Sequence, residues 1–408
     1  MNRKELKNKK VCLLSDHHIS VNPRLWKEAF FYEKLGFEVV IFTMWLSKSL
    51  LQKDRQILKD HAISYQTYLN LIPGEINPVS RFFFRLRKRI ANELQRFLHI
   101  GTGWAISHSP HRMVRMALSA NADLYAAHLE CAFFAGRELI GAGKKVSFDF
   151  EDWYSRDYLV PERPVKLLSQ LEKFALENGI FCTAASESMA SAIKKYYGIQ
   201  KEITVVYNGF SINENIASEN RETVDQKQDL VKLLWFSRTI GPNRGIESLL
   251  KALQVCDLPV ELHLLGDMAE GYNEYLKRNF PYHKGHGLKI HSFIPHNELM
   301  SFISKFQIGL ALEENVNDNR HLTITNKILQ YLQAGLFIIA SDTAGQREVA
   351  SYFPGTVSII KLEHPKELVS AVKEFSKRKE VNQQDKFQTI FSWEAQEKKF
   401  IKLTENYL

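Results

Sequence analysis

Short apolar runs alternate with amphipathic segments along the whole chain. Apolar residues fill each run without the every-second-residue alternation of a half-exposed strand, as in strands of a parallel sheet that is covered on both faces. The predicted strands are 10–15, 37–42, 122–127, 146–150, 179–184, 203–207, 232–236, 260–265, 308–312 and 336–340. Between them, apolar residues recur at helical spacing, as Leu25, Ala29 and Phe30 do in the first helix. The pattern predicts an α/β protein built from doubly wound parallel sheets.

One polar stretch interrupts this alternation. Residues 212–230, INENIASENRETVDQKQDL, contain almost no large apolar side chains and read as a linker. The strand–helix alternation restarts at residue 231. We therefore predict two Rossmann-like domains of similar size, 1–211 and 231–390, with 212–230 between them.

Composition adds little to the fold prediction but narrows the class of protein. The chain has 408 residues, 45% of them hydrophobic and 25% charged, which is enough for two full cores. Its four cysteines are scattered and none pairs at metal-ligand spacing, which indicates a reducing compartment. The N-terminal apolar run is too short for a signal peptide, and no window reaches the length of a membrane span. We expect a cytoplasmic protein, and its net charge of +8 suits an anionic partner without choosing one.

The segment 306–349 has the strongest local pattern. A buried run, 308–312, leads through a polar loop at 313–321 into a helix that opens around Thr325, Asn326 and Lys327 and ends before Gly335. In open α/β sheets the ligand lies at the carboxyl ends of the strands, and a helix N-terminus favours an anion. The alternative is an ordinary corner of any doubly wound domain.

A second candidate anion site follows the run 232–236. The loop predicted at 237–245 contains Arg238 and Arg244 among glycines. Arginine grips phosphate oxygens with a planar fork of donors, and glycine allows the backbone to approach the ligand. We expect phosphate binding here, although two incidental arginines on a surface loop would look the same.

The first loop of the chain, 16–23, lacks the G-x-G-x-x-G pattern, which disfavours a nicotinamide or flavin dinucleotide. His17 and His18 in this loop could touch a substrate, or they could be solvated or capping residues. His128, at the end of the run 122–127, is the better single candidate because strand ends face the ligand in this architecture.

Three carboxylates crowd the end of the run 146–150, namely Asp149, Glu151 and Asp152. Two of them could act as acid and base, or bind a metal, if they share a cleft. The ordinary alternative is that one caps the next turn and another is solvated.

Basic and aromatic residues mix in the segment 79–98, which begins VSRFFFRLRKRI. Such a helix can lie on an anionic bilayer, and we assign possible membrane contact to 81–99. The alternative is a core-packing helix with a solvated basic face. Single-stranded nucleic acid would also suit this composition, but nothing else in the chain looks like a nucleic-acid module, so we predict no nucleic-acid partner.

The order of several segments resembles the GT-B glycosyltransferases, specifically the family-4-like enzymes of bacterial surface-polysaccharide assembly, over nearly the whole chain. The segments are VVYNGF at 205–210, FSRTIGPNRGIESLLKAL at 236–253, LHLLGD at 262–267, SFIPHNEL at 292–299, NKILQYLQAGLFIIASD at 326–342 and FSWE at 391–394. The resemblance implies two Rossmann-like domains facing a central cleft, with a last helix, 391–408, that packs back on the N-terminal domain.

The resemblance also implies functional roles. The C-terminal half would hold a nucleotide-sugar donor, with Arg238 on the diphosphate, Arg244 where the family usually has lysine, and His128 near the reacting sugar. The expected donor-binding residues are Gly241, Gly266, Asp267, Glu314, Thr325, Asn326, Lys327 and Gln330. The expected acceptor-binding residues in the N-terminal half are His17, His18, Asp149, Glu151 and Asp152. Protein cations would replace a metal at the leaving group, so no metal and no cofactor are expected.

The chain departs from the family at a motif that pairs two glutamates, E-x7-E. The aligned positions hold Leu322 and Gln330, so neither carboxylate is present. Gln330 could still hydrogen-bond ribose hydroxyls, and Glu313 or Glu314 could supply a carboxylate from the preceding loop. The segment 149–152 and the loop 15–20 also differ from the usual pattern. These departures leave the stereochemistry, the donor and even the activity open.

We predict a hexosyltransferase-type glycosyltransferase that moves a sugar, with retention of configuration, from a nucleotide donor to a glycan or lipid-linked acceptor in surface polysaccharide or lipopolysaccharide biosynthesis. It would work in the cytoplasm or peripherally on the inner face of the membrane. One alternative is a non-catalytic GT-B protein that partners or scaffolds an active transferase. Another is a nucleotide-sugar epimerase of the same fold, which the segments 236–253 and 326–342 disfavour.

Overall fold

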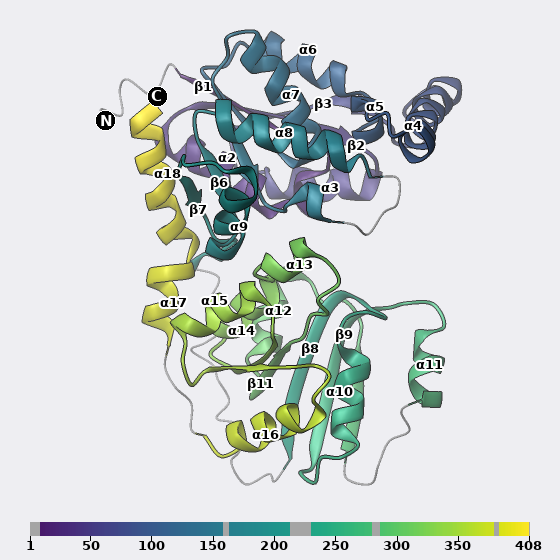
Figure 1. The fold of residues 1–408 in the computed structure, drawn as a ribbon, viewed down its shortest axis with the longest axis vertical. Coiled ribbons are helices and arrows are strands. Elements are labelled where there is room, and N and C mark those ends of the chain that lie inside the picture. The colour runs from purple at the N-terminus through teal and green to yellow at the C-terminus, as the bar shows by residue number, and fades with distance from the viewer. Residues whose placement is uncertain (1–8, 158–162, 213–229, 280–285, 379–382, 408) are drawn as a thin grey trace. The chain divides into compact units, whose positions relative to one another are not determined.

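The computed structural model describes residues 9–157, 163–212, 230–279, 286–378 and 383–407. The chain forms two compact units, one from residues 1–206 with 397–408 and one from residues 207–396. We call them the N-terminal and the C-terminal unit. Each is built around one sheet, and every strand pairing in both sheets is parallel (Figure 1). The predicted α/β class with two parallel sheets is confirmed.

The sheet of the N-terminal unit has seven strands in the order β3-β2-β1-β4-β5-β6-β7. Its strands are β1 (Lys10–Leu14), β2 (Glu38–Trp45), β3 (Ser64–Asn70), β4 (Leu124–His128), β5 (Val146–Phe150), β6 (Cys182–Ala184) and β7 (Ile203–Val205). Its helices are α2 (Pro23–Leu35), α3 (Lys48–Ile57), α4 (Pro78–Leu98), α5 (Gly103–Ile106), α6 (Pro110–Ala120), α7 (Leu129–Gly141), α8 (Val165–Asn178) and α9 (Glu187–Tyr197).

The sheet of the C-terminal unit has six strands in the order β10-β9-β8-β11-β12-β13. Its strands are β8 (Val231–Ile240), β9 (Val260–Met268), β10 (His286–His291), β11 (Ile308–Ala311), β12 (Phe337–Ser341) and β13 (Val357–Ile360). Its helices are α10 (Ile246–Leu253), α11 (Tyr272–Asn279), α12 (His296–Ile303), α13 (Asp318–Leu322), α14 (Asn326–Gln333), α15 (Ala344–Tyr352), α16 (Pro365–Phe375) and α17 (Gln384–Phe391).

The strand orders locate the ligand edge of each unit. In the N-terminal unit the chain builds outward from β1 to β3 and then returns to the other side of β1 with β4. In the C-terminal unit the same reversal falls between β8 and β11. At such a switch point the two connections leave in opposite directions and open a crevice beyond the strands' carboxyl ends. The carboxyl ends of β1 with β4, and of β8 with β11, are therefore where each unit can hold a ligand.

Local sequence explains how the helices at these edges begin and end. Helix α2 opens with Pro23, and the side chain of Asn22 caps it by accepting a hydrogen bond from the backbone N–H of Leu25 at 3.2 Å. The helix ends at Gly36, whose φ of 97° is a left-handed conformation that glycine adopts without strain. This turn places the chain at the start of β2.

The last helix, α18 (Trp393–Tyr407), contributes its residues from 397 onward to the N-terminal unit. Lys34 Nζ lies 2.7 Å from Glu397 Oε2, and Lys399 Nζ donates to the carbonyl of Val205 at 2.7 Å. The ring of Phe400 packs against that of Phe31. The end of the chain is thus held beside α2 and the edge strand β7.

Two local predictions were wrong. Strand β8 does not end at Phe236 but runs to Ile240, so Arg238 lies in a strand and not in a loop. The pairing with β9 shifts register between Phe236 and Thr239, and Gly266 permits this because a Cβ there would lie 2.2 Å from the carbonyl oxygen of Ser237. The loop predicted at 313–321 contains the short helix α13, which Asn317 caps through the backbone N–H of Arg320.

Two glycines of α7 test how closely this helix approaches the sheet. A Cβ on Gly136 would lie 2.5 Å from the ring of Phe148 in β5, whereas a Cβ on Gly141 meets nothing within 4 Å. We expect Gly136→Ala to lower the free energy of unfolding by about 1–3 kcal/mol through overpacking. Gly141→Ala, in the same helix, should leave it unchanged or raise it by up to about 1 kcal/mol. Urea unfolding of both variants checks this, and equal stability of the two would contradict the packing described.

Candidate functional site

At the switch point of the C-terminal unit, two arginines follow the core of β8. Arg238 is exposed, and among the described residues it has no hydrogen bond or ion pair. Arg244 is held by a hydrogen bond from its Nη1 to Ser237 Oγ at 2.9 Å. Asn243 and Gly245 both take left-handed backbone conformations, with φ of 60° and 75°. The segment 241–245 therefore makes a tight turn in which Arg244 is fixed, whereas Arg238, in β8 before the turn, stays open.

Glycines and an acid complete the ends of β8 and β9. Gly241 is buried, and a Cβ there would come within 3.3 Å of the Ala269 side chain, so a larger residue would crowd the turn. Gly266 lies where β9 passes the irregular part of β8, and Asp267 beyond it is exposed. Glu314 Oε1 accepts a long hydrogen bond of 3.4 Å from the backbone N–H of Gly245. Glu314 thus joins the end of β11 to the turn after β8.

Helix α14 begins beside these strand ends. Its N-cap, Thr325, makes no side-chain cap bond, and its Oγ1 is buried without a partner among the described residues. Asn326 is exposed, and its Oδ1 accepts from Asn208 Nδ2 at 2.9 Å. Gln330 is buried and has no side-chain hydrogen bond within the part of the chain described here. The first N–H groups of a helix have no partner inside it, so an uncapped start can accept an anion.

Lys327 differs from its neighbours because its charge is already paired. The side chain is 7% exposed, and its Nζ lies 2.5 Å from Glu313 Oε1 and 5.2 Å from the centre of the Trp235 ring. Glu313, which could have replaced the missing carboxylate of the family motif, is the partner of this lysine. The structure therefore ties Glu313 and Lys327 together at the end of β11.

In the N-terminal unit, the two adjacent histidines after β1 lie in opposite environments. His17 is exposed. His18 is buried, with Nδ1 2.5 Å from Asp54 Oδ2, and its Nε2 accepts from the backbone N–H groups of Leu46 and Ser47. Because Nε2 accepts, the ring is the neutral tautomer that carries its proton on Nδ1. His18 binds the loop to β2 and α3 with both nitrogens.

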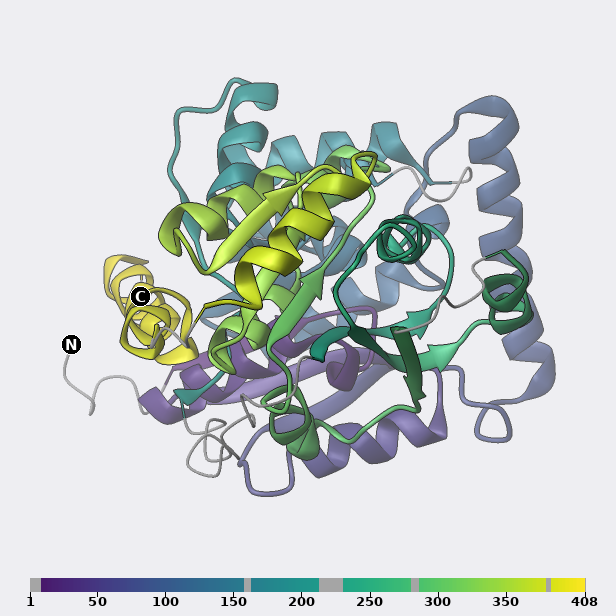
Figure 2. The ribbon, with the colours of Figure 1, turned by 90° about the horizontal axis from the view of Figure 1, so that it is seen from below.

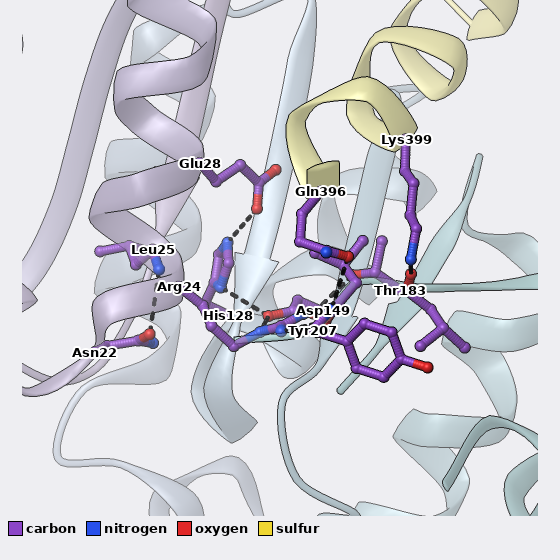
Figure 3. Close-up of polar contacts among 12 residues, drawn as sticks. Asn22, Arg24, Leu25, Glu28, His128, Asp149, Thr183, Tyr207, Gln396 and Lys399 are labelled. Carbon is purple, nitrogen blue, oxygen red and sulfur yellow. Dashed lines mark hydrogen bonds and ion pairs between the residues drawn. The ribbon is translucent and has the colours of Figure 1, made fainter. Parts of the chain in front are cut away.

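At the ends of β4 and β5 lies a buried chain of charges (Figure 3). Arg24 donates two hydrogen bonds to Asp149, from Nε at 2.7 Å and from Nη2 at 2.5 Å. His128, 1% exposed, lies between Asp149 and Glu28, with its Nε2 2.8 Å from Glu28 Oε2 and its Nδ1 3.3 Å from Asp149 Oδ2. Thr183 Oγ1 donates to Asp149 at 2.6 Å. The sheet thus brings His128 and Asp149 together, as parallel neighbouring strands must.

These buried charged residues shift one another's pKa values. Burial alone would lower the pKa of His128, but the carboxylates of Glu28 and Asp149 raise it to about 10. Burial would raise the pKa of Asp149, but Arg24 and His128 hold it well below its usual range. His128 is therefore an imidazolium at neutral pH and cannot accept a proton.

The other carboxylates at these strand ends behave differently. Burial and the nearby charge of Asp152 raise the pKa of Glu151 to about 7, and its Oε2 is buried without a hydrogen bond among the described residues. Burial also raises the pKa of Glu130 to about 7, despite an ion pair with Arg163. Glu130 follows Leu129, whose φ of 68° is unusual for a leucine and marks a sharp turn from β4 into α7.

Sequence reasoning missed several of these residues. Arg24, Glu28 and Asp54 lie in helices that looked like ordinary amphipathic segments, and Glu130 lies in the first turn of another. Pro23, which starts a helix right after the first βα loop, was the only signal that Arg24 would face the strand ends.

Helix α4 presents a different surface. It has 21 residues, and Figures 1 and 2 show it at the rim of the N-terminal unit, away from the sheet. An apolar stripe recurs along it at spacings of three and four residues, and these side chains are 36–70% exposed: Val79, Phe82, Phe83, Leu86, Ile90, Leu94, Phe97 and Leu98. Arg85, Arg89 and Arg96 line one side of the stripe, and Glu93 lies within it.

No described helix is both long and apolar enough to cross a membrane. No group of three or more His, Cys, Asp and Glu side chains in the described ranges is arranged to hold a metal ion. The expected independence from a metal or cofactor stays a prediction.

Comparison with solved structures identifies the fold of this chain. No family model matches the sequence, and no curated protein matches it either. Solved structures do match: Anabaena HepE in complex with UDP-glucose aligns with a TM-score of 0.64 at 15% identity, over 97% of this chain and 99% of that one. The sucrose-phosphate synthase of Thermosynechococcus elongatus aligns with a TM-score of 0.65 at 14% identity, over 98% and 99%. A UDP-forming trehalose-phosphate synthase of Burkholderia xenovorans aligns with a TM-score of 0.65 at 11% identity, over 98% and 99%.

The chain has the GT-B fold. The alignment spans both units, and the two parallel sheets match the expectation from the sequence. At these identities the similarity establishes the fold, and the roles of Arg238, Arg244, His128 and the other named residues stay predictions.

The buried ion pair can be tested directly. Asp149→Asn would leave the guanidinium of Arg24, which is 3% exposed, without its charged partner. We expect the free energy of unfolding to fall by about 3–5 kcal/mol, as it does when one member of a buried ion pair is removed. Asp60→Asn, at a side chain that is 79% exposed, is the matched control and should change it by less than about 0.5 kcal/mol. A loss below about 1 kcal/mol for Asp149→Asn would show that this pair does not anchor the strand ends.

Proposed function

We propose that this protein is a glycosyltransferase that uses a nucleotide-diphosphate sugar as donor. The observation that carries the proposal is the exposed Arg238 at the switch point of the C-terminal unit, beside the fixed Arg244 and the uncapped N-terminus of α14. Structures with the same fold were solved with UDP and UDP-glucose. UDP-hexoses are therefore the first donors to test.

The proposed chemistry follows from the positive charges at the switch point of the C-terminal unit. The bond between the anomeric carbon and the diphosphate oxygen breaks, and negative charge develops on the departing diphosphate. Two guanidinium groups and the positive end of a helix lower the free energy of that charge. Asn326 and Gln330 offer amides to the sugar or the nucleoside, and Glu314 positions the turn that carries Arg244.

The protonation states favour retention of configuration. An inverting transfer needs a general base beside the acceptor hydroxyl. Asp149 is ion-paired and Glu130 is paired with Arg163. The pKa of Glu151 is about 7, so only about half of this carboxyl is ionised near neutral pH. In a retaining path the departing diphosphate oxygen can take the acceptor proton, and His128 as a cation would stabilise charge. We assign the acceptor to the strand ends of the N-terminal unit, around His17, Glu151 and Asp152.

A thermal-shift screen tests donor binding. We expect one of UDP, GDP, ADP and CMP to raise the melting temperature selectively, since a ligand at a hundredfold excess over its Kd stabilises the native state by about 2.7 kcal/mol. Arg238→Ala should weaken that nucleotide by about tenfold or more, because it removes a charged hydrogen-bond donor. Arg278→Ala, at an exposed arginine of α11, is the matched control and should bind as the wild type does.

If no nucleotide shifts the melting temperature, the favoured function becomes that of a non-catalytic partner of an active transferase. The same conclusion follows if Arg238→Ala restores glycan synthesis in a deletion strain as well as the wild-type gene does.

We further propose that the enzyme works on the inner face of an anionic membrane, on a glycan or lipid-linked acceptor of a surface polysaccharide or lipopolysaccharide. The exposed apolar stripe of α4 supports this, because basic residues beside such a stripe attract anionic headgroups. Glu93 lies one helical turn from Arg89 and from Arg96, whose charges offset its own. We therefore propose that a lipid bilayer covers the apolar stripe of α4.

Vesicle sedimentation tests the membrane contact. Phe83→Ser combined with Phe97→Ser should lower binding to vesicles containing phosphatidylglycerol by about tenfold or more, since an inserted phenylalanine contributes about 1.5–3 kcal/mol. Val255→Ser, at a side chain that is 64% exposed in the C-terminal unit, should leave binding unchanged. Equal sedimentation of the Phe83/Phe97 variant and the wild type would remove the membrane proposal. Charge reversal at Arg87 is unsuitable, because this residue stacks on Trp104.

A further inference from the structure

A cavity of about 620 Å³ lies beside β7, the strand at one edge of the N-terminal sheet. Helices α9 and α18 line it together with this strand, and every lining residue belongs to the N-terminal unit. Figure 1 shows both helices next to β7. Ligand-binding pockets in proteins commonly have a volume of this size. The cavity is therefore large enough to hold a ligand.

Strand β7 offers unpaired backbone groups to this cavity. The backbone N–H of Val206 donates to the carbonyl of Ala184 in β6 at 2.9 Å, so the backbone groups of alternate residues face β6. Those of Ile203 and Val205 point the other way, and the carbonyl of Val205 accepts from Lys399 Nζ at 2.7 Å there (Figure 3). The N–H and C=O of Ile203 and the N–H of Val205 have no hydrogen-bond partner among the described residues. The edge of the sheet is thus open toward the cavity.

Lysines from both helices line the same cavity. Lys194 of α9 is half-buried and Lys402 of α18 is exposed, and within the described part of the chain neither forms an ion pair or a side-chain hydrogen bond. The third lysine, Lys399, is the one bonded to β7. Two glutamates, Glu187 and Glu202, also line the cavity, so its lining carries three positive and two negative charges. The lysines without partners make this place suitable for carboxylates.

An extended peptide matches these groups better than a small anion does. A small anion accepts hydrogen bonds from lysines, but it does not match the alternating donors and acceptors of a strand, which a second backbone does. Proteins commonly bind peptides by adding a strand to an open sheet edge. Because neighbouring side chains of a strand point to opposite faces, two adjacent acidic residues can reach lysines on different helices. The buried side chains of Ala190 and Leu403 offer apolar surface to the residues between the acids.

We propose that this cavity binds an extended acidic segment of a partner protein, which adds to β7 as a further strand of the N-terminal sheet. The backbone of the segment pairs with Ile203 and with the N–H of Val205, and its carboxylates pair with Lys194 and Lys402. Strands β5 and β6 separate β7 from β4, so this surface is distinct from the strand ends where we place the acceptor. The interaction goes beyond the transfer reaction and does not depend on it.

The test uses the full-length protein labelled with ¹⁵N-isoleucine, and the amide signal of Ile203 is assigned by its loss in Ile203→Val. The probe is a capped hexapeptide of two glutamates, two valines and two glutamates. Binding should shift the Ile203 signal and slow exchange of its amide hydrogen with solvent by about tenfold or more, because this N–H gains an acceptor. The amide of Ile338, in β12 of the other unit, is the internal control and should not respond. No response of Ile203 at millimolar peptide overturns the proposal.

Two further probes separate strand addition from attraction of any anion. A hexapeptide of the same sequence with every amide N-methylated keeps its carboxylates but has no N–H to donate, so it should bind about tenfold more weakly or worse. Equal affinity of the two peptides would show that no strand is added. Inorganic phosphate should leave the Ile203 amide unchanged. The same response of Ile203 to phosphate as to the hexapeptide would assign the cavity to a small anion and overturn the peptide site.

Matched double variants test the lysines. Lys194→Glu with Lys402→Glu should weaken the hexapeptide by about tenfold or more, since it replaces two attractive charges with repulsive ones. Lys195→Glu with Lys398→Glu makes the same charge change at exposed neighbours on the same two helices, outside the cavity lining, and should bind within about threefold of the wild type. Melting temperatures of both variants check that they fold. Equal weakening by the two variants would replace the site with diffuse electrostatic attraction.

Discussion

Parallel strand pairing is the constraint on which the rest of this structure depends. Because every strand of each sheet runs the same way, the carboxyl ends of all strands in a unit lie at one edge of its sheet. The reversal in strand order opens that edge for a ligand. Residues far apart in sequence meet there for this reason alone. His128 and Asp149 end adjacent strands, and Glu314 reaches the turn after β8. The sheet order thus places a cationic edge in the C-terminal unit and a mixed acid–base edge in the N-terminal unit.

The two edges use charge in different ways. At the sheet edge of the N-terminal unit, Arg24, Asp149, His128 and Glu28 are buried and paired with one another. They hold the strand ends together and leave His128 a fixed cation. In the C-terminal unit Arg238 remains exposed near the end of β8, just before the turn that contains Gly241 and Gly245. A rigid edge suits the orientation of an acceptor, and an open guanidinium suits the binding of a diphosphate that arrives and leaves.

The sequence predicted the central strands and the edge strand β7, and it missed the other three edge strands. Strands β3, β10 and β13 are edge strands, and β3 and β13 are only partly buried, so they lack the long apolar runs on which the predictions relied. The overlong β8 was missed because its polar end, with Ser237 and Arg238, pairs through an irregular register. Most of the buried charge network could not be foreseen, since Arg24 and Asp149 are 125 residues apart and nothing local marks them as partners. The amphipathic helix α4 was predictable because its signal is entirely local.

Hydrogen–deuterium exchange with and without UDP most directly tests the central claim that the C-terminal unit holds a nucleotide diphosphate at its switch point. Backbone amides in residues 238–245 and 325–330 should exchange more slowly with the nucleotide bound, because the ligand contacts the turn after β8 and the start of α14. Protection elsewhere without protection in these two segments would contradict this claim, and so would unchanged exchange at a nucleotide concentration that raises the melting temperature.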